Sequence, residues 1–341
     1  MKTKLPGGVR PACFLIAFPM ILFGLFSPVR GTAENPVTLK VSALPYLSYA
    51  PIFIADEEGF FAEQGLSLHI VKFSQSGQSI PALARGDLDV SADSIGSSLF
   101  SAVSRGMRLK IVADKGHLSD ECSFGAIMVR KDLYDSGEIT TIDRLKGRRV
   151  ALELIPNFGY VYETILRKSN LTLDDIEIVE MAGPSKVAAL KSGAIEAASA
   201  GDPLITQLEA AGIAVKLADY QDFVPGFHTS TIIFGPNLLE KNPELGRRFM
   251  TAYLKGVRQY NRGKTGRNLE ILQKHTGLDL EILKKACFVS FYPDGHVNTD
   301  TIRAVQDWAH KRGYIDRKIP VSQMVDMSFA EYANKSLGDA E

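Results

Sequence analysis

Residues 39–94, LKVSALPYLSYAPIFIADEEGFFAEQGLSLHIVKFSQSGQSIPALARGDLDVSADS, decide the fold, because β-forming runs and helical segments alternate along them. Residues 39–43 alternate apolar and polar side chains, and residues 66–73 are a second short apolar run, so both predict strands. Pro51 suits the first turn of a helix between them, and Gly59 and Gly65 suit positions where a helix ends. Strands separated by a helix predict a parallel sheet.

Three loops follow the expected strands and carry hydroxyl, amide or aromatic side chains. They are residues 45–49 (PYLSY), 74–79 (SQSGQS) and 93–98 (DSIGSS). In open α/β sheets, small ligands bind beyond the carboxyl ends of the strands, where helix N-termini offer unpaired N–H groups. We therefore expect these loops to line a ligand site. None of the three contains Lys or Arg, so neither a triphosphate nor a nucleic acid is the expected ligand.

The same alternation returns farther along the chain. Residues 113–119 predict a connecting segment, and Asn242–Pro243 predict the start of a long helix that ends at Tyr260. A further helix is expected to begin after Gly159, and a turn is expected at residues 292–295. Strands are expected at residues 125–129, 149–152, 176–180, 194–200 and 231–234.

This order predicts an α/β fold with two lobes, each built on a mostly parallel sheet, with a hinge and a cleft between them. Residues 219–230 would return the chain to the lobe in which it began. The expected boundaries are residues 34–116 and 228–341 for a discontinuous lobe 1, and residues 117–227 for an inserted lobe 2. A few residues in the two connections could absorb a closing motion.

Residues 1–33 are typical of a secretory signal peptide. Three basic residues precede an apolar run of about 15 residues, which is shorter than the roughly 20 that span a bilayer. Small residues at Gly31 and Ala33 indicate cleavage near Ala33. The prediction is an exported, periplasmic protein that contacts the membrane only through a partner. A single membrane anchor is the alternative.

The charge balance gives no indication of nucleic-acid binding. The chain has 39 basic and 39 acidic residues, and the expected signal peptide contains four basic residues and no acidic one. The mature chain would carry a formal charge of about −4, and it has no polybasic block.

Cysteine usage leaves the redox state open. Cys122 and Cys287 would remain after export to an oxidising compartment, so a disulfide is possible, although buried free thiols are slightly favoured. No Cys or His partner stands at ligand spacing, so neither a metal site nor a cofactor is expected.

Several motifs resemble the solute-binding proteins of ABC transporters, in the nitrate/sulfonate/taurine and thiamine-pyrimidine (NMT1/THI5-like) group. They are residues 45–66, 76–93 and 102–113 near the start, and residues 242–260, 292–315 and 321–333 near the end. The resemblance covers nearly the whole mature chain. It implies the type II periplasmic-binding-protein fold, usually monomeric, with a permease and an ATPase as partners.

Candidate ligand contacts come from the loops of both expected lobes. Aromatic side chains at a cleft can enclose a planar ring, and carboxylates at strand ends can accept hydrogen bonds from a ring N–H or an amine. Packing between strands and helices is the alternative for the aromatic residues, and helix capping for the acidic ones. The candidates are Tyr46, Ser48, Tyr49, Ser76, Gly77, Asp93, Ser94, Asn157, Phe158, Asp202 and Phe227.

Two of these positions carry additional arguments. Asp202–Pro203 looks like the acidic residue–proline pair that the resembling group places at its cleft. Ser76 and Gly77 approach a helix that starts near Pro81, where free N–H groups could receive an oxyanion. His228, by contrast, is expected to be a hinge or surface residue.

Motifs of catalysis are absent from the sequence. It contains no Gly-x-Ser-x-Gly elbow, no P-loop and no Gly-x-Gly-x-x-Gly fingerprint. The iron-binding cysteine motif of the pyrimidine-synthesising relatives is also missing, because residues 121–124 contain a single cysteine. We therefore expect a binding protein and not an enzyme.

The expected function is capture of a small organic ligand for an ABC importer. Aromatic loops, two strand-end carboxylates and the lack of a cation in the first three loops favour a heteroaromatic ligand of the thiamine-pyrimidine or flavin type. The serines keep an alkanesulfonate, taurine or nitrate as the alternative. A ligand sensor for a membrane receptor would use the same closure.

Overall fold

The computed structural model describes residues 1, 7–8, 35–73, 77–121, 124–181, 183 and 185–338. The expected signal peptide and its cleavage site at Ala33 lie outside the described residues, except for positions 1, 7 and 8. Residues Asn35–Glu341 form one compact unit. Among the described residues, no helix combines the length and the apolar character needed to cross a bilayer.

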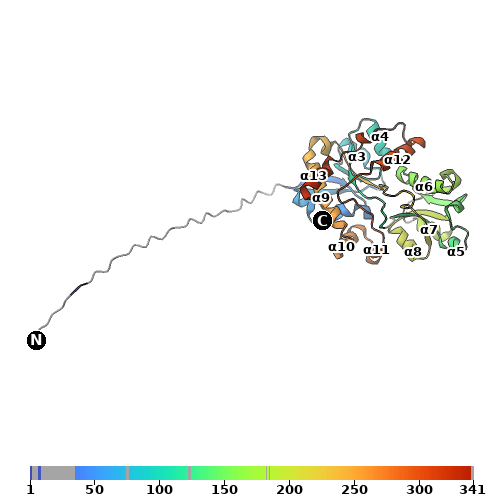
Figure 1. The fold of residues 1–341 in the computed structure, drawn as a ribbon, viewed down its shortest axis with the longest axis horizontal. Coiled ribbons are helices and arrows are strands. Elements are labelled where there is room, and N and C mark those ends of the chain that lie inside the picture. The colour runs from blue at the N-terminus through green and yellow to red at the C-terminus, as the bar shows by residue number, and fades with distance from the viewer. Residues whose placement is uncertain are drawn as a thin grey trace. The chain divides into compact units, whose positions relative to one another are not determined.

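Two five-stranded sheets form the frame of this unit (Figure 1). The first sheet has the strand order β2-β1-β3-β10-β4, and the second has the order β7-β6-β8-β5-β9. The first sheet consists of β1 (Val37–Ser42), β2 (Leu66–Val71), β3 (Val90–Asp93), β4 (Lys110–Asp114) and β10 (Thr231–Phe234). The second consists of β5 (Gly125–Arg130), β6 (Arg149–Leu152), β7 (Glu177–Glu180), β8 (Ala197–Gly201) and β9 (Ala214–Asp219). The two sheets have the same topology, because β6, β7, β8, β5 and β9 take the places in the second sheet that β1, β2, β3, β10 and β4 take in the first.

Both sheets are mixed, yet four of the five strands in each run in the same direction, so the sheets are mostly parallel as predicted. β1 pairs in parallel with β2 and β3, as predicted, and β6 pairs in parallel with β7 and β8. β10 and β5 each run antiparallel to both of their neighbours. Each is the first strand after the chain passes from one sheet to the other. Because the chain leaves a sheet at its carboxyl edge and enters the facing edge of the other, that strand must run in the opposite direction.

The helices flank the two sheets. The α-helices are α1 (Ala50–Glu57), α2 (Phe60–Glu63), α3 (Ile80–Arg85), α4 (Ser97–Ser104), α5 (Lys131–Asp135), α6 (Pro156–Lys168), α7 (Ser185–Ser192), α8 (Leu204–Ala210), α9 (Pro243–Tyr260), α10 (Gly266–Thr276), α11 (Leu280–Lys285), α12 (Thr299–Lys311) and α13 (Ser328–Leu337). Short 3-10 helices are η1 (Leu47–Tyr49), η2 (Ile142–Leu145), η3 (Leu173–Asp175) and η5 (Val321–Gln323), and η4 (Asn237–Lys241) is a short π-helix. In Figure 1, α9, α10 and α13 lie at one end of the unit and α5, α7 and α8 at the other.

Local signals account for the start or end of several of these helices. Pro51 lies in the first turn of α1, and Gly59 adopts a left-handed φ of 75° between α1 and α2. The Asn242 side chain accepts a hydrogen bond from Leu245 N and caps α9, which begins and ends where the sequence predicted. The predicted start of α6 was wrong, because Pro156 opens this helix three residues before Gly159.

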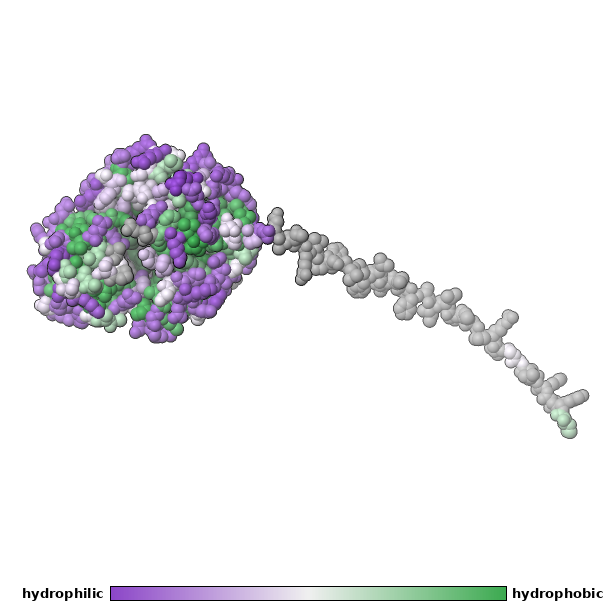
Figure 2. All heavy atoms as spheres, turned by 180° about the vertical axis from the view of Figure 1, so that it is seen from behind, coloured by the Kyte–Doolittle hydropathy of each residue, from purple (hydrophilic) through white to green (hydrophobic). Residues whose placement is uncertain are grey.

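Three clusters of buried apolar residues stabilise the unit. One lies between the first sheet and helices α1 and α9, and includes Val41, Phe249 and Tyr253. A smaller one, with Leu190 and Ile205, lies beneath α7 and α8 on the second sheet. The largest contains residues from both sheets and from α12. Figure 2 shows one face of the unit, on which apolar and polar side chains surround a central hollow.

The chain passes between the sheets twice, at residues 115–124 (the first crossing) and residues 220–230 (the second crossing). The two crossings are hydrogen-bonded to each other: Lys115 N donates to Ser230 O at 3.1 Å, Thr229 N to Gly116 O at 2.8 Å and Leu118 N to Phe227 O at 2.9 Å. The expected connecting segment started too early, because Ala113 and Asp114 still belong to β4. The lobe boundaries that we propose fall within these crossings.

Helix α12 lies in the C-terminal segment and packs against α6, a helix that flanks the second sheet. The Trp308 ring lies against Gly159, where a Cβ atom would overlap it. Trp308 Nε1 donates to Glu163 Oε2 at 2.8 Å, and Arg312 Nε donates to the same oxygen at 2.9 Å. Beyond α12, the chain returns to the first sheet, where Ile111 N donates to Met324 O at 2.7 Å. The C-terminal segment therefore contacts both sheets.

We predict that Glu163→Gln destabilises the protein. The Glu163 side chain is 3% exposed, and Arg167 Nε also donates to it at 2.9 Å. Although burial raises the pKa of Glu163, the hydrogen bonds from Trp308, Arg312 and Arg167 lower it below its ordinary value. Hydrogen bonds to a charged group contribute about 1.5–3 kcal/mol each, so the unfolding free energy at pH 7 should fall by about 2 kcal/mol.

Urea denaturation at several pH values measures this change. A carboxyl with a lowered pKa stabilises the folded state above its unfolded pKa, and that stabilisation is lost as the pH falls through its folded pKa. The difference between wild type and Glu163→Gln should therefore shrink in acid. The exposed Glu209→Gln is the matched control. Equal stability of Glu163→Gln and wild type at pH 7 would contradict the prediction.

Candidate functional site

A cavity of about 780 Å³ lies between the carboxyl edges of the two sheets. Its wall includes the loop after β1, the residues that follow β3 and β4, and the end of the second crossing. The opposite wall consists of the residues that end or follow β6, β7 and β8, together with the start of α8. Most of the lining side chains are apolar, among them Leu44, Phe158, Leu204 and Leu278. Cavities of this size and character are typical of small-molecule sites.

Seven of the candidate ligand contacts line this cavity: Tyr46, Ser48, Tyr49, Asp93, Ser94, Phe158 and Asp202. The loop after β1 supplies the first three. Tyr46 is 57% exposed, whereas Tyr49 is 5% exposed and its hydroxyl donates to Ala92 O at 2.7 Å. Burial, reinforced by the nearby Asp93 carboxylate, raises the pKa of Tyr49. Tyr46 therefore presents an exposed ring at the cavity, while Tyr49 is held in the wall by its hydroxyl.

Lys115 is one of the cavity residues that the sequence reasoning missed, together with Glu153 and Glu180. Its side chain lines the cavity from the start of the first crossing, and only 1% of the residue is exposed. Lys115 Nζ donates to Ser48 Oγ at 3.2 Å and to Ser230 Oγ at 3.1 Å, and it lies 3.7 Å from the centroid of the Tyr49 ring. Lys115 directly follows β4, as Ser94 directly follows β3. The expectation that residues after strand ends line the ligand site (the strand-end rule) would have identified Lys115 if it had been applied to β4 as well.

The buried position of Lys115 changes its acidity. Burial lowers its pKa to about 7, although the nearby Asp93 and Asp114 carboxylates oppose this by favouring the ammonium form. An anion placed against the ammonium group would raise the pKa again. The two serine hydroxyls can turn toward an anion as additional donors. This corner of the cavity, formed by Lys115, Ser48 and Ser230, is suited to an acidic group, and we call it the basic corner.

Asp93 holds the loop after β2. Gly77 N donates to both oxygens of its carboxylate, at 2.9 and 2.8 Å, and Ser79 Oγ and Ser94 N donate at 2.7 and 2.8 Å. The carboxylate therefore lines the cavity but is already bound by neutral donors. Contact between Asp93 and a ligand remains a prediction.

Three candidate residues do not line the cavity. Gly77 binds Asp93 and has a φ of 82°, which favours glycine. Asn157 is fully buried in the first turn of α6, and its Nδ2 donates to Thr229 O at 2.9 Å. Phe227 is 3% exposed and its ring stacks on Tyr160 at 5.7 Å. Each thus has a packing or hydrogen-bonding role in the protein. The candidate Ser76 lies outside the described residues.

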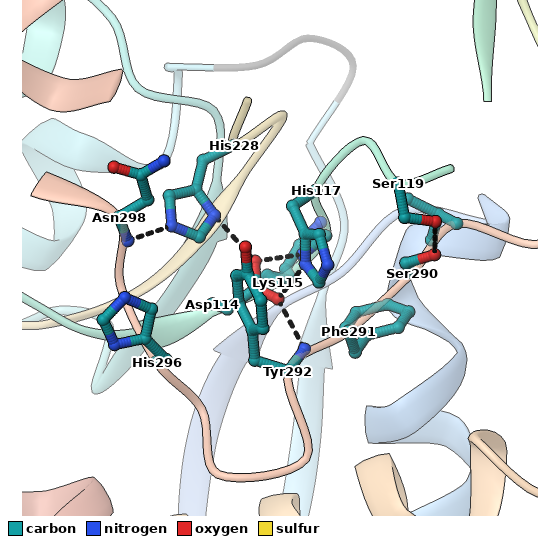
Figure 3. A network of polar contacts seen from close by, with 12 residues as sticks. Asp114, Lys115, His117, Ser119, His228, Ser290, Phe291, Tyr292, His296 and Asn298 are labelled. Carbon is teal, nitrogen blue, oxygen red and sulfur yellow. Dashed lines mark hydrogen bonds and ion pairs between the residues drawn. The ribbon is translucent and has the colours of Figure 1, made fainter. Parts of the chain in front are cut away.

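A network centred on Asp114 fixes both crossings beside the cavity (Figure 3). Asp114 Oδ1 accepts hydrogen bonds from Gly116 N at 2.8 Å and His228 Nδ1 at 2.9 Å. Its Oδ2 accepts from His117 Nδ1 at 2.9 Å and Tyr292 N at 3.0 Å. Burial raises the pKa of Asp114, but the hydrogen bonds from the two histidines outweigh this and lower it to about 2.

The two histidines have structural positions in this network. Asn298 N donates to His228 Nε2, so the hydrogen on His228 Nδ1 is the one shared with Asp114. The His117 ring stacks on Tyr292 with a centroid distance of 3.7 Å. Neither histidine lines the cavity. Within the described residues, no group of His, Cys, Asp and Glu side chains is arranged to hold a metal ion.

Cys287 is disulfide-bonded, so the slight preference for a free thiol was wrong for this residue. Cys13 and Cys122, the other cysteines of the sequence, lie outside the described residues. Cys287 N also donates to Asp202 Oδ2 at 2.9 Å, which ties this segment to the cavity wall. The disulfide is consistent with an oxidising compartment.

Sequence comparisons find a matching family model and relatives that are named as binding proteins. A family model described as NMT1/THI5 like matches residues 47–261. A Brucella abortus (strain 2308) protein, provisionally assigned as a binding protein, is 25% identical over 74% of this chain and 76% of its own length. The taurine-binding periplasmic protein of Escherichia coli (strain K12) is 25% identical over 69% of this chain and 71% of its own length.

Comparisons of structure show the same fold. The alkanesulfonate-binding protein SsuA from Xanthomonas axonopodis pv. citri, solved with MOPS, has a TM-score of 0.68 at 17% identity and covers 86% of this chain and 99% of its own. The periplasmic nitrate-binding protein NrtA from Synechocystis PCC 6803 has a TM-score of 0.71 at 15% identity, with 89% of each chain covered. The desulfurization enzyme DSZB has a TM-score of 0.65 at 16% identity, covering 89% of this chain and all of its own. The fold therefore occurs in binding proteins and in an enzyme.

We predict that Lys115 makes the stability of the unliganded protein depend on pH. Its pKa is about 7 in the folded protein and 10.5 in the reference state. The unfolded chain therefore binds more protons between these values, and the unfolding free energy should rise with pH across this window. Compared with Lys115→Met, the wild type should gain stability between pH 6 and pH 10.

Denaturation by urea at pH 6, 8 and 10 gives the unfolding free energies of wild type and of Lys115→Met. The exposed Lys191→Met provides the control, because its difference from wild type should stay constant with pH. If the difference between wild type and Lys115→Met is equally constant, Lys115 does not titrate in this range and the prediction is wrong.

Proposed function

Because the chain belongs to the NMT1/THI5-like family, we propose that it is the solute-binding component of an ABC importer and that its cavity captures an organic anion of the sulfonate type. The buried Lys115 ammonium group at the basic corner is the observation that carries the anionic part of this proposal. Relatives of the chain include a protein named for taurine binding and one provisionally named as an ABC transporter periplasmic binding protein. A membrane permease, working with an ATPase subunit, would receive the ligand from the protein.

The expected heteroaromatic ligand of thiamine-pyrimidine or flavin type is not confirmed. That expectation depended on the lack of a cation in the first three loops, and Lys115 supplies a cation from a fourth segment. Tyr46 and Phe158 still line the cavity, so an aromatic ring in the ligand remains compatible with it. The anionic alternative is the one that the basic corner favours.

Binding without catalysis is part of the proposal. Sharing a fold with a desulfurization enzyme does not decide the matter, because one fold can host both activities. Among the described residues that line the cavity there is no Cys or His, so neither a Cys–His nor a Ser–His pair is present there. The carboxylates of Asp93 and Asp202 are held by backbone and hydroxyl donors.

Export to the periplasm is the remaining part of the proposal. The family relative from Escherichia coli is named as a periplasmic protein. If residues 1–33 are a signal peptide cleaved after Ala33, the mature protein begins at Glu34. Intact-mass measurement of protein recovered from a periplasmic extract checks this. A mass that includes the first 33 residues would contradict cleavage.

We predict that Lys115→Met weakens the binding of organic sulfonates. A hydrogen bond to a charged group contributes about 1.5–3 kcal/mol, so the dissociation constant of a sulfonate that binds the wild type should rise at least about tenfold. The affinity of the wild type should also fall as the pH rises above 7, because Lys115 then loses its proton.

Isothermal calorimetry with a panel of alkanesulfonates, taurine, nitrate, pyrimidines and flavins provides the measurement, after bound ligand has been removed by unfolding and refolding. Lys191→Met is the control for the loss of a surface charge. Binding of a pyrimidine or flavin that Lys115→Met leaves unaltered would refute the anionic ligand class. The anionic ligand class would also be refuted if Lys115→Met bound sulfonates as tightly as the wild type does.

A further inference from the structure

Three carboxylates lie in a row on the cavity wall formed by the second sheet. Glu180 is the last residue of β7, Glu153 directly follows β6 and Asp202 directly follows β8. These three strands are adjacent and parallel, in the order β7-β6-β8, so their carboxyl ends meet at one edge. All three acidic side chains line the cavity. We call them the acidic row.

Only one member of the acidic row is paired with a cation at contact distance within the described residues. Lys186 Nζ donates to Glu153 Oε1 at 2.8 Å, and it also donates to Ser199 O at 3.0 Å. Lys186 is 2% exposed, so this pair is fixed in the wall. Glu153 is therefore compensated by the protein itself.

The other two carboxylates lack such a partner. Asp202 accepts hydrogen bonds from Thr206 N at 3.0 Å, Thr206 Oγ1 at 2.7 Å and Cys287 N at 2.9 Å, all of which are neutral donors. Lys264 is close enough to sense its charge, but Lys264 Nζ donates to Lys284 O and Ala286 O. Glu180 is exposed and forms no ion pair with another described residue.

The first-sheet wall carries a cation, Lys115 at the basic corner, together with Asp93, whose carboxylate accepts hydrogen bonds from Gly77 N and Ser79 Oγ. An anionic group is attracted to Lys115, yet a ligand with only that charge would bring no cation to Asp202 or to the exposed Glu180. A ligand with a positive group at its other end satisfies both walls. The apolar lining between them, including Leu44, Phe158 and Leu204, suits an apolar body. A cavity of about 780 Å³ also has room for a ligand with such a body.

We propose that the ligand is amphoteric, with an acidic head at Lys115, Ser48 and Ser230, an apolar body, and a cationic group that lies between Glu180 and Asp202. This inference rests on the proposed function, because it assigns a cationic group, which we call the second pole, to the same anionic ligand. The cavity and the buried cation define the site, and the acidic row specifies the charge at its far end. The ligand then bridges the two sheets through groups of opposite charge.

Three probes with a shared shape test the second pole. The first, 3-(1-pyridinio)-1-propanesulfonate, carries a fixed positive charge in its ring, and 3-phenyl-1-propanesulfonate replaces that ring by a neutral one. The third, 1-propylpyridinium, lacks the sulfonate. Calorimetry with the full mature protein at pH 6.5 should show that the pyridinium sulfonate binds at least about tenfold more tightly than each of the other two, which corresponds to about 1.4 kcal/mol.

Variants of the acidic row show whether it causes this preference. Glu180→Gln should reduce the preference for the pyridinium sulfonate over the phenyl sulfonate at least threefold, and Glu180→Gln combined with Asp202→Asn should abolish it. Glu180 is exposed, so its single variant remains informative even if the double variant does not fold. Glu209→Gln, an exposed acidic residue that does not line the cavity, should retain the full preference.

The outcomes separate this inference from the proposed function. If the phenyl sulfonate binds as tightly as the pyridinium sulfonate, and Lys115→Met weakens both, the ligand is a simple anion and the second pole is refuted. If Glu180→Gln and the double variant both keep the full preference, the acidic row is not its cause and the inference is likewise overturned. If neither sulfonate binds, the anionic ligand class of the proposed function fails as well. Binding of 1-propylpyridinium as tightly as the pyridinium sulfonate would refute the acidic head.

Discussion

The buried carboxylate of Asp114 fixes the region on which the rest of the structure depends. It ends β4, and each of its oxygens accepts two hydrogen bonds, from the first crossing, from the second crossing and from Tyr292. A buried carboxylate must be satisfied by donors, because removing one from water without partners costs several kcal/mol. The two crossings and residues 290–298 are thus held together at one point.

The same constraint builds the basic corner of the cavity. Lys115 follows Asp114 directly, and Ser230 lies on the second crossing two residues after His228. Fixing Asp114 therefore also fixes the ammonium group and one of the hydroxyls beside it. A ligand that interacts with Lys115 acts on the segment that joins the sheets. Binding can favour one arrangement of the sheets to the extent that this interaction differs between arrangements.

Helix α12 limits how the sheets can move relative to each other. It belongs to the C-terminal segment, yet Trp308 and Arg312 bind the buried Glu163 of α6. On either side of α12 the chain is hydrogen-bonded to the first sheet and the crossings, at Met324 and Asn298. Rotation about the crossings must either break the Glu163 contacts or carry α12 with the second sheet.

The sequence by itself determined the α/β class, most strand positions and several helix ends. These features depend on residues a few positions apart, such as the left-handed Gly59 after α1 and the Asn242 cap of α9. The parallel pairing of β1 with β2 and β3 also followed from the short apolar runs and the helices between them. The strand-end rule placed Asp93 and Asp202 on the cavity wall, because the carboxyl edge of a sheet is set by strand direction alone.

Only the tertiary structure decided the basic corner, the reversal of β10 and β5, and the position of α12. Lys115 meets Ser48 and Ser230 across 67 and 115 positions of sequence, and Trp308 meets Glu163 across 145. No local pattern specifies such pairs, because they depend on how complete elements pack. Asn157 and Phe227 show the same limit, since helix packing turned these loop candidates away from the cavity. Short-range propensities set the elements, and long-range packing selected which side chains share a site.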